Sequence, residues 1–133
     1  MESRGLEIAR PPDETCCALV VTESPVLREL IAGFIVQSDL QIGQVFCAPN
    51  RKEASEICRR IQVDVLVADQ LFEFRRGEGP VSSIIVGPPS AERIQDSLER
   101  GAAGYLVKPF SKDSLVQEVR RALAGQPAAA SIA

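Results

Sequence analysis

The 133-residue sequence contains no histidine and no tryptophan, and it has only one tyrosine and one methionine. The absence of histidine excludes a Ser-His-Asp triad, histidine acid–base catalysis, imidazole-bound zinc and phosphoryl transfer through a histidine of this chain. The four cysteines, Cys16, Cys17, Cys47 and Cys58, include no Cys-x-x-Cys pair. Their spacing therefore indicates neither a metal site nor a disulfide framework, and we expect small, reduced core residues.

The chain also lacks an excess of basic charge and any long apolar run. Its 15 Lys and Arg against 18 Asp and Glu give a net charge of -3, which predicts that this domain alone does not bind nucleic acid. No run approaches the roughly 20 apolar residues of a membrane span. Residues 1–15 are polar and lack the apolar core of a secretion signal, so we expect a flexible leader and a cytoplasmic protein.

Short apolar runs alternate with helical patterns along the rest of the chain. We expect strands at residues 18–21, 41–48, 63–68, 83–86 and 105–107, and helices at 25–35, 51–61, 91–100 and 112–123. This alternation predicts one α/β domain over 16–125, with a flexible tail over 126–133. Five strands of this size fit a flavodoxin-like, doubly wound parallel sheet in the order 2-1-3-4-5.

One connection between strands is unusually short. Only 13 residues, QLFEFRRGEGPVS, separate Asp69 from the next strand's Ser83, which predicts a shortened or missing third helix. Leu71, Phe72 and Phe74 can cover part of the sheet there. We expect the remainder to be covered by inward shifts of neighbouring helices or by another molecule, and hence a homodimer or a partner at this face.

Polar and special residues gather where the predicted strands end. Glu23, Asp69, Gly87 and Lys108 all lie at C-terminal strand ends, the edge of a doubly wound sheet where ligands bind. Simpler interpretations exist: Asp69 is also typical of a turn or helix cap, and Lys108 can serve only to neutralise it. Tyr105, in the strand before Lys108, is equally consistent with plain packing.

The segments VDVLVAD, ending on Asp69, and GAAGYLVKPF, containing Lys108, resemble the receiver domains of bacterial response regulators. The resemblance covers residues 16–125. It implies that Asp69 accepts a phosphoryl group from a histidine kinase, that Lys108 contacts the phosphoryl oxygens, and that Glu23 and Asp69 help to hold magnesium. It also implies that Tyr105 is the aromatic switch residue and that the Lys108–Pro109 bond is cis.

The sequence departs from that family pattern at two site positions besides the short connection. Thr22 stands where the first acidic magnesium ligand belongs, and Gly87 stands where a hydroxyl would bind the phosphoryl group. The resemblance therefore predicts a pseudo-receiver that needs no cofactor, binds magnesium weakly, and acts by contacting other signalling proteins, with phosphorylation at Asp69 weak or absent.

Two other functions stay open at this point. One is a phosphorylation-competent receiver, whose only enzymatic activity would be its own modification at Asp69. The other is a flavodoxin-like binder of flavin or another phosphate ligand. The loop at residues 22–25 is poor in glycine for a phosphate cradle, and this disfavours the flavin-binding alternative.

Overall fold

The computed structural model describes residues 16–74, 78–125 and 129–131, in which strands and helices alternate except at one place, where two strands follow each other without a helix. The elements are β1 (Cys16–Val21), α1 (Pro25–Val36), β2 (Ile42–Ala48), α2 (Arg51–Arg60), β3 (Val65–Ala68), β4 (Ser82–Gly87), α3 (Ala91–Glu99), β5 (Gly104–Val107), α4 (Lys112–Leu123) and β6 (Ala129–Ser131). The predicted leader, residues 1–15, lies outside the described residues. None of the helices in the described ranges is long and apolar enough to cross a membrane.

All neighbouring strands of the sheet are parallel, in the order β2-β1-β3-β4-β5-β6. The first five strands confirm the predicted order 2-1-3-4-5. The sixth strand was not predicted, because residues 126–133 were expected to be a flexible tail. Ala129–Ser131 instead pair with β5, with Gly104 opposite Ala129. An alanine-rich segment carries no strand signal, whereas the exposed backbone of an edge strand can pair with any extended segment.

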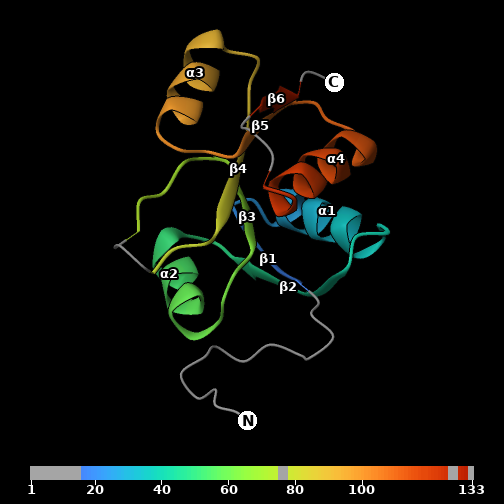
Figure 1. The fold of residues 1–133 in the computed structure, drawn as a ribbon, viewed down its shortest axis with the longest axis vertical. Helices are drawn as coiled ribbons and strands as arrows, with labels where there is room; N and C mark the ends of the chain where they lie inside the picture. Colours follow the sequence, from blue (N-terminus) through green and yellow to red (C-terminus); the bar gives the residue numbers. More distant parts are fainter. Residues whose placement is uncertain (1–15, 75–77, 126–128, 132–133) are drawn as a thin grey trace.

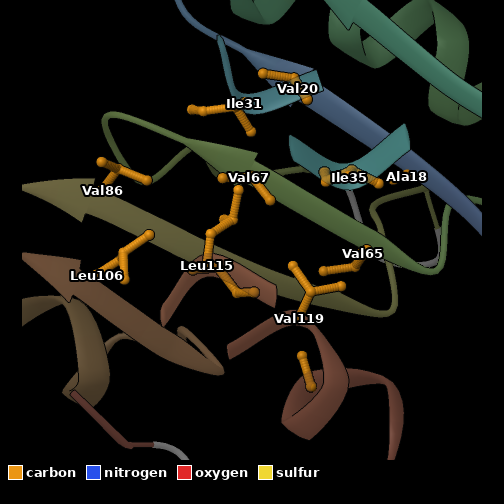
Figure 2. Close-up of a cluster of buried hydrophobic side chains, with 12 residues drawn as sticks. Ala18, Val20, Ile31, Ile35, Val65, Val67, Val86, Leu106, Leu115 and Val119 are labelled. Carbon is orange, nitrogen blue, oxygen red and sulfur yellow. The ribbon is translucent and has the colours of Figure 1, made fainter. Parts of the chain in front are cut away.

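Helices cover both faces of the sheet (Figure 1). On one face α1 and α4 pack on a buried cluster of alternating strand residues, including Val20, Val67 and Leu106, and α4 contributes Leu115 to it (Figure 2). On the other face Leu19 and Leu66 belong to a cluster with α2, and further residues pack against α3. The strands read as continuous apolar runs because their side chains are buried on both sides.

Each helix starts at a side chain that caps its first turn. Ser24, Asn50, Ser90 and Ser111 each accept a hydrogen bond from the backbone N–H three residues later. The predicted caps at Ser90 and Ser111 are therefore confirmed. The caps satisfy N–H groups that have no partner within the helix, and so they fix where the helices begin at the carboxyl edge of the sheet.

The connection from β3 to β4 contains no helix in residues 70–74 or 78–81, which confirms the predicted loss. Its side chains replace the helix in part. Phe72 and Phe74 pack against the cluster under α2, and Leu71 packs against the cluster under α3. Gly79 lies so close to Phe74 that a β-carbon added to Gly79 would be 3.0 Å from the Phe74 β-carbon and 3.1 Å from its ring.

The apolar gap expected at this connection is not present in the described structure. On the face beneath the loop, Leu66, Ala68 and Ile85 are each only 1% exposed. Within the connection Val81 is the exposed large apolar residue, at 67%. The protein's own loop covers the sheet, so the physical reason for placing a partner at this face is removed.

Not every cysteine is a core residue. The four cysteines, all within the described residues, form no disulfide, and Cys17 and Cys58 are buried. Cys16 is half-buried, however, and Cys47 is exposed on β2. The expectation was wrong for Cys47 because β2 is an edge strand, where residues within an apolar run still face solvent.

Replacing Phe72 or Phe74 by alanine should destabilise the fold although both lie in a loop. We expect each change to lower the free energy of unfolding by about 1–3 kcal/mol, since half-buried aromatic packing on the sheet is lost. Urea denaturation measures the effect. Val81→Ala is the matched control and should stay within about 0.5 kcal/mol of the parent; equal stabilities for all three variants would show that the loop does not cover the sheet.

Candidate functional site

The C-terminal strand ends bring three of the predicted site residues, and Thr22 beside them, to one edge of the sheet. Thr22 follows β1, Asp69 follows β3, Gly87 ends β4 and Lys108 follows β5. The strand register sets Thr22 level with Asp69, because Val21 pairs with Ala68. Gly87 lies one residue further along its strand, because Ala68 pairs with Ile85, and Lys108 follows Val107, the partner of Gly87. The topology therefore brings these four positions to the same edge of the sheet.

Thr22 binds Asp69 directly. Its Oγ1 donates a hydrogen bond of 2.7 Å to Oδ2 of Asp69 and accepts a bond of 3.2 Å from the backbone N–H of Ser24. The Arg28 guanidinium donates to the Thr22 carbonyl at 2.8 Å. Thr22 itself is only 2% exposed. A neutral, fixed hydroxyl thus orients the carboxylate of Asp69 where the family pattern has a negative charge.

The other charged residues of the predicted site do not converge on Asp69. Glu23 and Lys108 are exposed, and no ion pair joins Lys108 to Asp69 within the described residues. The backbone of Lys108 donates instead to the Gly87 carbonyl at 2.8 Å, and its peptide bond to Pro109 is cis. The simple interpretation of Lys108 as a counterion of Asp69 is therefore not supported.

The donor set fits magnesium poorly. Magnesium prefers six oxygen ligands in an octahedral arrangement, including one or two carboxylates. Here one oxygen of Asp69 already accepts the Thr22 hydroxyl hydrogen bond, and Glu23 is the other candidate carboxylate. Among the described residues, no group of three or more His, Cys, Asp or Glu side chains could hold a metal ion.

Tyr105 fills the space over Gly87. Its side chain is fully buried, and its hydroxyl donates a 2.9 Å hydrogen bond to the carbonyl of Pro88. A β-carbon built on Gly87 would overlap with the Tyr105 hydroxyl oxygen. Burial raises the pKa of Tyr105, while the positive charge of Arg93 opposes this shift. The absence of a side chain at position 87 therefore permits the inward position of the ring.

Sequence reasoning missed two contacts of this site. Thr22 was considered only as a missing carboxylate, although a hydroxyl after one strand can reach an aspartate after the neighbouring strand. Pro88 gave no signal at all, because it contributes a backbone carbonyl. The local signal for the Tyr105 position was the glycine at the end of β4, whose lack of a side chain leaves room for a neighbour.

No family model matches the chain. The chemotaxis protein CheY of Listeria monocytogenes is 24% identical over 115 residues, which make up 78% of this chain and 95% of that protein. Among solved structures, the Francisella response regulator 1452 receiver domain superposes with a TM-score of 0.70 at 22% identity, covering 84% of this chain and 98% of the other. The chemotaxis response regulator CheY4 of Vibrio cholerae gives 0.66 at 20% identity, covering 82% and 99%.

These likenesses agree with the sheet order. The chain is similar in sequence to CheY-like response regulators and has the flavodoxin-like fold of receiver domains. The described residues contain four helices, because the β3–β4 connection is an extended loop.

Replacing Gly87 by alanine should expel the Tyr105 ring. The ring is the single tyrosine of a chain without tryptophan, so tyrosine fluorescence and ultraviolet absorbance report on it alone. We expect stronger quenching by acrylamide and a lower tyrosine pKa in Gly87→Ala, near the ordinary value of about 10. Gly33→Ala, where a β-carbon meets nothing within 4 Å, is the control and should leave both properties unchanged.

The buried Tyr105 hydroxyl also predicts how the stability of the fold changes at alkaline pH. Burial raises the pKa of folded Tyr105 above its unfolded value, so the stability that it contributes is complete below pH of about 10. It is lost as the pH rises through the folded pKa. Thermal unfolding of the parent should therefore lose more stability above pH 10 than that of Gly87→Ala, and identical pH profiles would contradict the inward position.

Proposed function

We propose that this protein is a receiver-like signalling domain that acts mainly by binding other signalling proteins, with phosphorylation at Asp69 weak or absent. The observation that carries the proposal is the inward position of Tyr105, buried over Gly87 and bonded to Pro88. With the Tyr105 ring in this position, packing alone determines the shape of the surface around β5 and α3. No phosphoryl group on Asp69 is needed to produce that shape.

The contacts of Asp69 support the same proposal. Thr22 supplies a hydrogen bond but no charge, so the attraction for a divalent ion is lower than with a carboxylate at that position. Gly87 supplies no hydroxyl that could contact a phosphoryl group on Asp69. The link from such a group to the Tyr105 ring therefore lacks its first contact. The proposal makes the domain non-enzymatic, with a cytoplasmic location and no binding to nucleic acid by itself.

A phosphorylation-competent receiver is the second candidate, favoured by one specific observation. Oδ1 of Asp69 has no hydrogen-bond partner among the described residues, while Oδ2 is held by Thr22. The free oxygen could attack the phosphorus of a phosphohistidine on a kinase, with cleavage of the phosphorus–nitrogen bond. Lys108, which follows β5 two strands away from β3, is the candidate cation for the phosphoryl oxygens.

Thr22→Asp should strengthen a magnesium site that is weak in the parent. A second carboxylate beside Asp69 strengthens the attraction for the divalent ion, and we expect magnesium affinity to rise at least tenfold. Calorimetric or NMR titration with magnesium chloride measures this change. Thr22→Val has nearly the same shape but neither charge nor hydroxyl, and it should bind no better than the parent. Comparable affinity in the parent and Thr22→Asp would contradict the weak-site proposal.

Beryllofluoride with millimolar magnesium distinguishes the two candidate functions. For a pseudo-receiver, NMR spectra should show at most small shifts near Asp69 and no change of the Tyr105 ring signals. The control is Asp69→Asn, which lacks the carboxylate that would bind beryllofluoride. Saturable shifts in the parent that reach Tyr105 and vanish in Asp69→Asn would establish the phosphorylation-competent receiver and overturn the proposal.

A further inference from the structure

The β2 strand leaves one edge of the sheet open. It is the terminal strand, next to β1. The Ala48 carbonyl accepts from the Thr22 N–H, so Ala48 faces β1. Because backbone groups alternate along a strand, Phe46 also faces β1, and Val45 and Cys47 direct their N–H and C=O groups outward. These outward groups have no partner among the described residues.

This edge lacks the usual protection against pairing. Native proteins place charges, prolines, bulges or short strands at sheet edges to prevent association. The β2 sequence IGQVFCA contains no charged residue and no proline. Its irregularity lies only at the start, where Cys16 pairs with Ile42 and Cys17 with Gln44. The opposite edge, β6, has three residues, so β2 offers the longer free edge.

We propose that a second copy of this chain pairs with β2 in antiparallel orientation, with the twofold axis at Phe46. In this register Val45 lies opposite Cys47 of the second copy, and Cys47 lies opposite its Val45. Each of these two pairs exchanges two N–H···O=C bonds, so every outward group of Val45 and Cys47 is satisfied. The two six-stranded sheets become continuous. This interface goes beyond the proposed function and does not depend on it.

The side chains on one face of β2 suit this register. Phe46 is half-buried in the cluster beneath α2. On the axis it lies opposite Phe46 of the second copy in a pair without mutual hydrogen bonds, where side chains approach most closely. Pairing would bury the exposed parts of both rings against each other, and aromatic cross-strand pairs are stabilising.

The position of Phe46 favours a second copy over an unrelated strand. Phe46 is the one aromatic residue of β2, and the twofold axis places the same ring of the second copy directly opposite it. Because β2 carries no charged residue, the two strands meet without like-charge repulsion.

A cross-linking experiment on the full chain tests the register. With Cys47 replaced by serine, Phe46→Cys would put two thiols opposite each other, with α-carbons about 4.5 Å apart, within the range of a disulfide. The matched control is Gln44→Cys on the same face. Its two thiols would be displaced by four residues, about 13 Å, along the strands. Under mild oxidation Phe46→Cys should form dimers at least tenfold faster. Equal rates, or no dimer in either variant, would overturn the proposal.

Sedimentation of single variants tests the edge itself. Proline at position 47 removes an outward N–H while leaving the bonds to β1 intact. Cys47→Pro should raise the dimer dissociation constant at least about tenfold, whereas Cys47→Val should remain dimeric. A monomeric parent at millimolar concentration would overturn the proposal and leave the edge to a strand of another protein. If Cys47→Pro does not fold, the cross-linking result decides.

Discussion

Burial of the central strands on both faces is the constraint on which the rest of this structure depends. β1, β3 and β4 carry continuous apolar runs, so any sheet surface left open would cost hydrophobic free energy. α1 and α4 cover one face, and α2 and α3 cover the other. Where a helix is missing, Leu71, Phe72 and Phe74 take its place from an extended loop. The same constraint fixes the strand ends, and hence the site.

The site differs from a standard acceptor site by two exchanges. Thr22 stands in place of a carboxylate, and its hydroxyl hydrogen bond orients Asp69 but adds no attraction for a cation. Gly87 stands in place of a residue with a hydroxyl side chain, and the Tyr105 ring fills the space that this side chain would occupy. Both exchanges favour one fixed arrangement over a change driven by a ligand. In the proposed function, this fixed arrangement would present a constant surface to other signalling proteins.

The two edges of the sheet differ in whether another strand of the chain pairs with them. β5 is covered by β6, which satisfies its outer backbone groups within the same chain. No strand within the described part of the chain pairs with the outer edge of β2, which carries no charged residue. Association through β2 would leave the carboxyl ends of the strands accessible, because antiparallel copies place their two sites at opposite ends of the joined sheets. Oligomerisation and partner binding could then operate independently.

The sequence by itself determined the parallel sheet, its strand order, the missing helix and the positions of Asp69, Gly87 and Lys108, since hydrophobic periodicity and strand ends are local signals. Tertiary structure alone decided the rest. The hydrogen bond between Thr22 and Asp69 joins residues 47 positions apart. The Tyr105 hydroxyl donates to the backbone carbonyl of Pro88. The pairing of β6 and the exposure of Cys47 depend on which strands lie at the edges. These features arise from distances between neighbouring strands, and no local pattern in the sequence encodes such distances.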